Sequence, residues 1–173
     1  MHHVVLTLIV IFLTIYQVAL AQVLANGNYR IYHGNYQVPS THRYFTAEPD
    51  ARQGRVRLHP KNDASQFQVW QLKNYKNDQV TLESVGASGK YLTPGRSGAL
   101  PGAYVGVSHK PQRFNISKKA GGPFTSYQLA YPKSVHNNTL VVSYDSNGEE
   151  PHYVNFKNLD VEGSLQAWKF VRV

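Results

Sequence analysis

The sequence Gln68-Val69-Trp70 occurs twice more in a related form, as Gln112-Arg113-Phe114 and as Gln166-Ala167-Trp168. In each copy a glutamine stands two residues before a large aromatic residue. An apolar residue follows two positions later, and these are Leu72, Ile116 and Phe170. The aromatic residues are spaced by 44 and 54 residues. A motif that returns at such a period marks a repeated supersecondary unit, and such units bury their apolar faces against one another. The sequence therefore predicts three similar units that share one core.

Short strands are expected throughout the chain after residue 27. Apolar and polar residues alternate with period two, or nearly so, which is typical of half-buried strands. The segments are 29–32, 55–58, 67–72, 80–83, 127–129, 139–143 and 167–171. Clusters of Gly, Asn, Ser and Pro separate many of them, at 76–78, 86–89, 94–98, 121–123 and 146–148. No long stretch has helical spacing, so we expect an all-β domain of about a dozen short strands.

Three units of about four strands each predict a β-trefoil. The first unit runs from Asn26 to about Leu72, the second ends near Ile116, and the third ends at Val173. In this architecture the closing aromatic residue of each unit points into one core around a pseudo-threefold axis. The glutamine of each repeat is expected to hydrogen-bond backbone groups in the adjoining turn, since buried polar groups need partners.

The first 21 residues are expected to be a signal peptide. Residues 4–16 form a near-continuous apolar run, and Ala19-Leu20-Ala21 is a small-x-small pattern before Gln22. The run is short for a membrane span, and no positive cluster follows it. We therefore expect cleavage after Ala21, export to the extracellular space and no membrane association afterwards. Residues 22–173 then form a single β-trefoil domain.

The composition favours a partner with negative charge. The chain has no cysteine and a formal net charge of +8, and the expected signal peptide contributes none of that charge. A cationic surface attracts anionic polysaccharides, acidic protein surfaces and nucleic acids, although it also serves solubility alone. Nucleic acid is the least expected of these partners for a secreted protein.

The repeated motif resembles the Gln-x-Trp repeat of ricin B-type trefoils. The segment 26–32 looks like the opening strand of small fungal trefoil inhibitors of serine proteases, the cospin type. The segments 103–116 and 166–173 are similar to their mid-chain and terminal segments. This resemblance covers the whole expected mature chain. It departs in one respect, because those inhibitors are often intracellular and this chain is expected to be secreted.

The resemblance implies a protease inhibitor that acts through the loop between the second and third strands. In this sequence that loop reads Ala47-Glu48-Pro49-Asp50-Ala51-Arg52-Gln53-Gly54, and residues 48–53 would enter the protease cleft. Pro49 would stiffen the loop, and Arg52 near its tip would suit the acidic pocket of a trypsin-like serine protease. The alternative interpretation, which the sequence favours, is that Arg52 is a solvated loop cation. Arg43 and Arg96 are fallback reactive residues on other loops. Some trefoils of this kind inhibit cysteine proteases, so the class of protease stays open.

A carbohydrate-binding lectin is the alternative function. Ricin-type sugar sites use an Asp, a stacking aromatic residue and an Asn immediately before the repeated glutamine. Here Phe67, Pro111 and Leu165 occupy the last position, so each site lacks one expected polar group. Tyrosine residues are candidate stacking platforms, although each also suits a core or cross-strand position. They are Tyr36, Tyr104 and Tyr144.

We do not expect the protein to be an enzyme, and we expect it to bind neither a cofactor nor a metal ion. The histidines show no metal-ligand spacing, and without cysteine there is no thiolate nucleophile. They are His33, His42, His59, His109, His136 and His152.

Two sequons make Asn115 and Asn137 candidate N-glycan acceptors. Asn137 lies in a polar turn, whereas Asn115 lies in an expected strand and must face outward. We expect the mature protein to be a monomer.

Overall fold

A computed structural model of the chain describes residues 23–34, 38–48, 54–119, 125–145, 152–160 and 164–173. The expected signal peptide and loop residues 49–53 lie outside this part. The first unit contains β1 (Gly27–His33), β2 (Arg43–Ala47), β3 (Val56–His59) and β4 (Trp70–Asn74). The second contains β5 (Gln79–Ser84), β6 (Tyr91–Pro94), β7 (Val105–Ser108) and β8 (Phe114–Lys119). The third contains β9 (Ser126–Ala130), β10 (Leu140–Tyr144), β11 (His152–Asn158) and β12 (Lys169–Arg172). Short 3₁₀ turns are η1 (Pro39–Thr41), η2 (Gln66–Gln68) and η3 (Ser164–Gln166).

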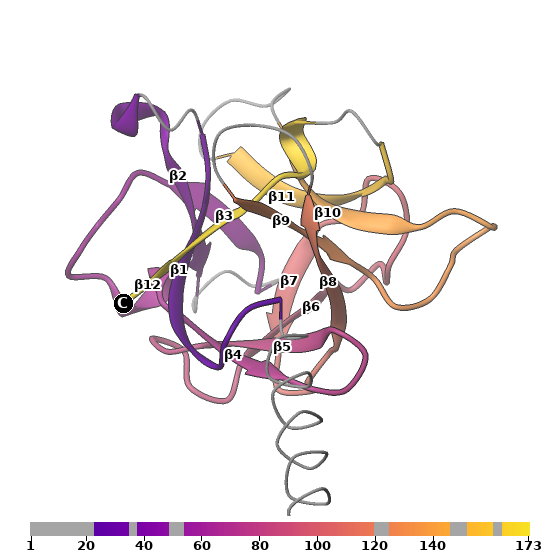
Figure 1. Cartoon of the computed structure of the whole chain (residues 1–173), viewed down its shortest axis with the longest axis horizontal. Coiled ribbons are helices and arrows are strands. Elements are labelled where there is room, and N and C mark those ends of the chain that lie inside the picture. The colour runs from indigo at the N-terminus through magenta and orange to yellow at the C-terminus, as the bar shows by residue number, and fades with distance from the viewer. Residues whose placement is uncertain (1–22, 35–37, 49–53, 120–124, 146–151, 161–163) are drawn as a thin grey trace, which may run out of the picture.

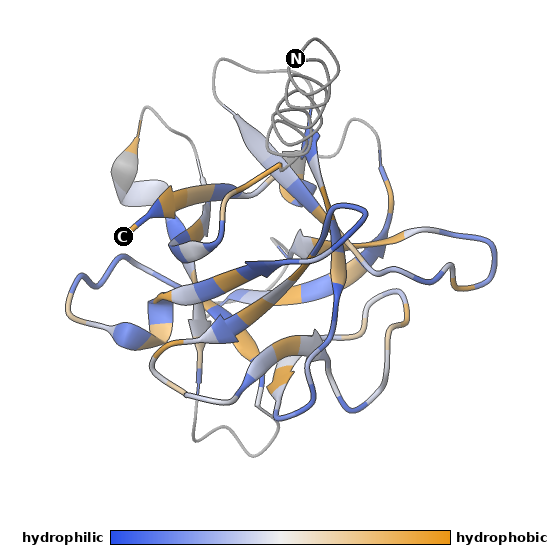
Figure 2. Ribbon diagram, turned by 60° about the horizontal axis from the view of Figure 1, so that its bottom comes forward, coloured by the Kyte–Doolittle hydropathy of each residue, from blue (hydrophilic) through white to orange (hydrophobic). Residues whose placement is uncertain are grey.

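The first and last strands of the three units form a closed antiparallel barrel (Figure 1). The pairs run β1–β4, β4–β5, β5–β8 and β8–β9, and β12 pairs with β1. Between β9 and β12, Tyr127 and Trp168 exchange two backbone hydrogen bonds of 2.8 Å. Apolar and polar residues alternate along the strands (Figure 2). The apolar residues therefore face the interior of the barrel, as period-two patterning requires.

The remaining strands form three hairpins, β2–β3, β6–β7 and β10–β11, which cap one end of the barrel. The hairpins also pair with one another in a triangle. Leu58 of β3 pairs with His152 of β11, Arg55 pairs with Gly106 of β7, and Tyr104 pairs with Asn155 of β11. A six-stranded barrel with three hairpins and threefold repetition is a β-trefoil, so the expected fold class is confirmed. The units end at β4, β8 and β12, close to the expected boundaries.

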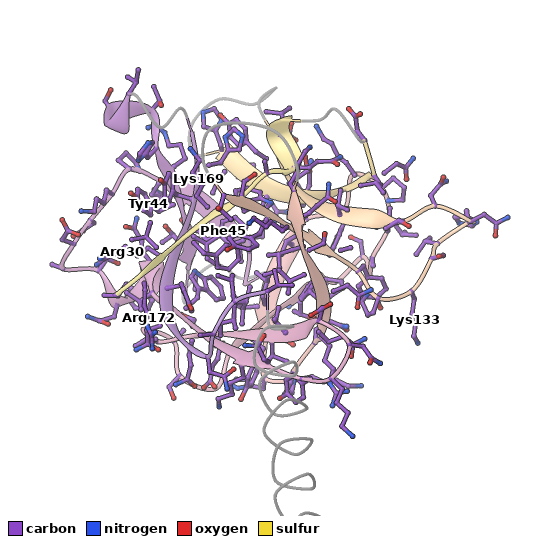
Figure 3. All side chains as sticks on the ribbon, in the orientation of Figure 1. Arg30, Tyr44, Phe45, Lys133, Lys169 and Arg172 are labelled. Atoms are coloured by element: carbon purple, nitrogen blue, oxygen red, sulfur yellow. The ribbon has the colours of Figure 1, made fainter. Side chains whose placement is uncertain are left out.

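The three repeated aromatic residues are fully buried and belong to one core. Trp70, Phe114 and Trp168 each have 0% exposure. Phe45 lies in the centre of the molecule (Figure 3), with its ring 4.4 Å from that of Trp168 and 6.4 Å from that of Trp70. Each indole N–H has a partner, since Trp70 donates to the carbonyl of Phe45 and Trp168 to that of Val142. The shared core predicted from the repeat is therefore confirmed.

Two of the three repeated glutamines bind backbone groups as expected. The Oε1 atom of Gln68 accepts from the N–H of Asn62, and its Nε2 donates to the carbonyl of Pro60, both at 2.8 Å. Gln166 makes the same pair of bonds, at 3.0 and 2.8 Å, to segment 158–160. Both glutamines are buried, with 2% and 3% exposure. Each one holds the loop that leads into the last strand of its unit.

The glutamine of the second unit does not follow this pattern, so the prediction is wrong there. Gln112 is only partly buried, and its Nε2 donates to the carbonyl of its neighbour Arg113. Gln68 and Gln166 each end a 3₁₀ turn, and in the described chain no such turn ends at Gln112. Pro111 explains the difference, because a proline disfavours helical backbone at the residue before it, here Lys110.

Candidate functional site

The loop between β2 and β3 begins on a fixed strand pair. Ala47 and Val56 form the last pair of the hairpin, and both are fully buried. The next residue, Glu48, lies between Arg57 and His59. Its Oε2 is 3.0 Å from Nε of Arg57, an ion pair without hydrogen-bond alignment, and its Oε1 is 3.0 Å from Nε2 of His59. The backbone and the Glu48 side chain together fix the start of the loop.

The end of the same loop is held by the second unit. The N–H of Val107 donates to the carbonyl of Gly54 at 2.5 Å, and Arg55 pairs with Gly106. The two backbones approach so closely that a Cβ on Gly106 would lie 2.7 Å from the carbonyl oxygen of Gly54. Gly54 itself has a left-handed φ of 51°, which glycine adopts without strain. The five expected protease-contacting residues between these anchors lie outside the described residues: Pro49, Asp50, Ala51, Arg52 and Gln53.

The two fallback arginines lie in different surroundings. Arg43 is the first residue of β2 and pairs with His33, so the structure places it in a strand rather than on a loop. Its guanidinium donates to the carbonyl of Ser40 at 3.0 Å. Arg96 is exposed in the turn between β6 and β7, as expected for a loop residue.

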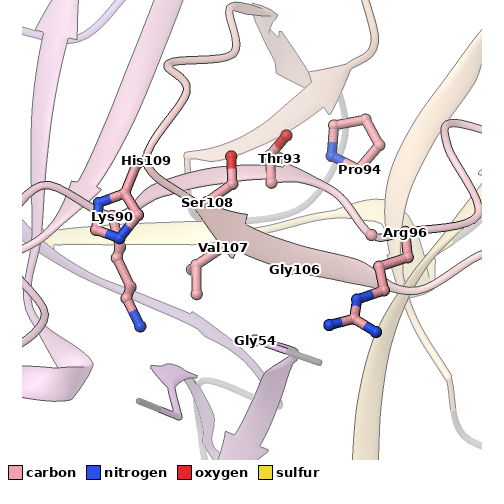
Figure 4. Close-up of a pocket in the computed structure, with 10 residues that line it drawn as sticks. Gly54, Lys90, Thr93, Pro94, Arg96, Gly106, Val107, Ser108 and His109 are labelled. Atoms are coloured by element: carbon pink, nitrogen blue, oxygen red, sulfur yellow. The ribbon is translucent and has the colours of Figure 1, made fainter. Parts of the chain in front are cut away.

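Two hollows meet at the β6–β7 hairpin beside the end of the loop. The first has a volume of about 380 Å³ and includes Gly54, Lys90, Arg96 and His109 in its lining. The second has a volume of about 300 Å³, and Arg96 lines it as well. In Figure 4, Lys90 and His109 lie at one end of the first hollow and Arg96 at the other. The hairpin strands between them carry small and polar residues.

The described lining of both hollows contains cationic side chains and no carboxylate. Arg55 and Tyr104 line the second hollow, where the guanidinium carbon of Arg55 lies 4.2 Å from the ring centre of Tyr104. It also lies 5.5 Å from the ring centre of Tyr153. These are cation–π contacts, which orient the guanidinium group over the rings. A ligand with negative charge would meet a favourable field in both hollows.

The tyrosines considered as sugar platforms are partly engaged by the protein. Tyr104 is 37% exposed, and Arg55 covers part of its ring. Tyr144 stacks on His33 at 4.9 Å, and His152 meets it edge-on at 5.1 Å. Tyr36 lies outside the described residues. The described tyrosines therefore offer less open ring surface than the sequence suggested.

Both candidate glycan acceptors have exposed side chains. Asn115 lies on the outward face of β8, where its Oδ1 accepts a hydrogen bond of 3.3 Å from Gln79. Asn137 lies in the exposed connection from β9 to β10, with a φ of 62°. The side chain of Asn115 therefore faces outward, as attachment of a glycan to this strand residue requires.

Arg55 and Lys90 of the hollows were not singled out in the sequence, and His109 was considered there only as a metal ligand. They lie in separate segments of two units, and no local pattern connects them.

Among the described residues, no group of histidine, aspartate and glutamate side chains could hold a metal ion. The same residues contain no helix that is long and apolar enough to cross a membrane.

No protein-family model matches the chain, and no curated protein matches it in sequence. Solved structures do match it in three dimensions. The agglutinin of Rhizoctonia solani is 21% identical with a TM-score of 0.65, over 87% of this chain and 97% of the agglutinin. The designed threefold-symmetric protein ThreeFoil is 16% identical with a TM-score of 0.64, over 85% and 99%. A mosquitocidal holotoxin is 15% identical with a TM-score of 0.67, over 87% of this chain and 18% of the toxin chain. At these identities the similarity concerns architecture, and the chain is a β-trefoil protein.

Proposed function

We propose that this protein is a secreted, monomeric inhibitor of serine endopeptidases with trypsin-like specificity. The supporting observation is the double anchoring of the loop between β2 and β3. Glu48 is held by Arg57 and His59 at one end, and Gly54 is held by the N–H of Val107 at the other. A loop whose two ends are held before binding loses less conformational entropy in a protease cleft, and this raises affinity.

An inhibitor of this kind needs no catalytic group of its own. The barrel and its cap supply a rigid support, and residues 48–53 supply the inserted segment. Arg52 would enter the specificity pocket, where its guanidinium pairs with the carboxylate of a trypsin-like enzyme. Such an anchor is fully desolvated in the complex, so it carries a large share of the binding free energy.

The test is inhibition of trypsin by the purified protein and by Arg52→Ala. Loss of the anchor should weaken inhibition more than about tenfold, since hot-spot truncations cost about 2 kcal/mol or more. The melting temperature should not change, because exposed loop residues contribute little to stability. Lys133→Ala is the matched control, since it removes one exposed cation from another loop. If Arg52→Ala inhibits as well as the wild type, this loop is not the reactive one, and Arg43 and Arg96 are tested next.

The anchoring itself can be tested without touching Arg52. Glu48→Gln removes the negative charge between Arg57 and His59 while keeping the size of the side chain. The variant should inhibit more weakly because the loop is less restrained before it binds. Parallel assays against cysteine proteases decide which class of protease is inhibited.

A carbohydrate-binding lectin is the second candidate. It is supported by the hollow at the β6–β7 hairpin, where Thr93 and Ser108 lie among the lining residues, and by the architecture shared with an agglutinin. Concave sites with a few polar groups are typical of ligand binding. A protein that inhibits no protease in the panel, yet is retained on a carbohydrate matrix and released by free sugar, would establish this candidate and exclude the first.

A further inference from the structure

The two hollows at the β6–β7 hairpin are neighbours, since Gly95 and Arg96 line both, and together they are here called the cationic hollow. Its cations sit on backbone that is fixed by hydrogen bonds. Lys90 closes a turn through its N–H, which donates to the carbonyl of Ala87 at 3.0 Å. The turn that carries Arg96 is closed by Gly98, whose N–H donates to the carbonyl of Gly95 at 2.9 Å.

The arrangement of charge favours an extended anionic ligand over a single small ion. Lys90 lies at one end of the first hollow and Arg96 at the other (Figure 4). Arg55 adds a positive charge to the lining of the second. A small anion would contact one of these positions at a time. A polymer with regularly spaced negative groups would contact several, and the hydroxyl of Thr93 between them suits its hydroxyl groups.

The aromatic surface argues against nucleic acid as the ligand. Proteins that bind single-stranded nucleic acid stack the bases on open aromatic rings. Tyr104 is the aromatic residue in the described lining of the hollow, and the guanidinium of Arg55 covers part of its ring at 4.2 Å. A sugar chain needs hydroxyl and charged partners more than open stacking faces.

We propose that the cationic hollow binds an acidic glycan, one that carries sulfate or carboxylate groups. This proposal rests on the second candidate function, the lectin, and is independent of protease inhibition. It assigns Lys90 and Arg96 as the residues that contact the negative groups. The net charge of +8 strengthens attraction at long range, while the hollow determines where the chain binds.

Dextran sulfate, carboxymethyl dextran and neutral dextran are suitable probes, because they share a backbone and differ in charge. Binding to each is measured by biolayer interferometry with the full secreted protein at physiological ionic strength. The wild type should bind the two charged polymers and not neutral dextran. The double variant Lys90→Gln/Arg96→Gln should bind the charged polymers at least about tenfold more weakly.

A second double variant, Lys118→Gln/Lys133→Gln, is the matched control. It removes the same formal charge from exposed residues that line neither part of the hollow. Equal melting temperatures for both doubles would show that folding is intact. The control should keep most of the affinity, because distant charges act only through the screened field.

Four results would overturn the proposal, and they separate it from the lectin function. Equal losses in the two double variants would mean that overall charge, and not the hollow, causes binding. Binding of dextran as tight as that of dextran sulfate would leave a lectin but remove its preference for acidic glycans. Binding to none of the polymers, together with an unreactive glycan array, would remove both. Competition by a single-stranded DNA oligonucleotide at equal charge concentration would show that the ligand is not specifically a glycan.

Discussion

The repeated glutamines provide a matched comparison of one side chain in two environments. Gln68→Ala removes two hydrogen bonds of 2.8 Å, and a longer one of 3.3 Å to Thr46, from a residue that is 2% exposed. At about 0.5–1.5 kcal/mol for each of the two short bonds, and about 0.8 kcal/mol for a buried methylene, the loss is about 2–4 kcal/mol. Gln112→Ala removes a bond to the neighbouring residue from a partly buried side chain. Its cost should stay within about 0.5 kcal/mol.

Thermal unfolding by circular dichroism measures the difference between the two variants. In a domain of about 150 residues, 1 kcal/mol shifts the melting temperature by about 2–4 °C. Gln68→Ala should therefore melt about 5–15 °C below the wild type, and Gln112→Ala within about 2 °C of it. Gln166→Ala should behave like Gln68→Ala, since it makes the same backbone contacts. Equal shifts of the melting temperature for Gln68→Ala and Gln112→Ala would refute the reasoning, because they would show that the hydrogen bonds of the buried glutamines to the preceding loop add no stability.

Further predictions concern the core, the cap, the surface and alkaline stability. Trp168→Ala should lose about 3–5 kcal/mol in urea unfolding, because a large cavity and an unpaired carbonyl remain. Gly106→Ala should lose about 1–3 kcal/mol in the same assay, since its Cβ would press on backbone. After secretion from a eukaryotic host, glycosidase treatment should lower the mass of the protein, and Asn137→Gln should remove more of this shift than Asn115→Gln. Burial raises the pKa of Tyr127, so the unfolded chain ionises first and the native protein loses stability as pH rises above 10. Tyr127→Phe should reduce that loss when unfolding is measured across this range.

The repeat and the strand pattern were sufficient to predict the fold, because both show which side chains are buried in the core. The Gln-x-aromatic motif located the core residue of each unit, and period-two alternation located strands such as β1, β5 and β10. Four strands, β6, β7, β8 and β11, were not located individually, although β8 alternates buried and exposed residues from Phe114 to Ser117. The expected strand 67–72 begins later, at Trp70, since residues 66–68 form a 3₁₀ turn. That turn is closed by the N–H of Val69, which donates to the carbonyl of Gln66, and no hydrophobic pattern reveals such a backbone bond.

The candidate site was less predictable, because it is built across units. Gly54 and Val107 meet through a backbone hydrogen bond between segments about fifty residues apart in the chain. Arg43 was expected on a loop, yet strand pairing with His33 places it in β2. The cationic hollow likewise combines turns from separate segments. Sequence patterns describe neighbours along the chain, whereas these contacts require the threefold arrangement of the cap.

Closure of the barrel by β12 against β1 has a consequence for biogenesis. During synthesis β1 emerges early, and its outer edge stays unpaired until β12 has been made. An exposed strand edge is a template for pairing with another chain. If β12 is delayed or truncated, a neighbouring molecule can supply the missing strand, and the result is a domain-swapped dimer or a longer assembly. Folding in the cell would therefore need β1 to be shielded until the third unit has been made.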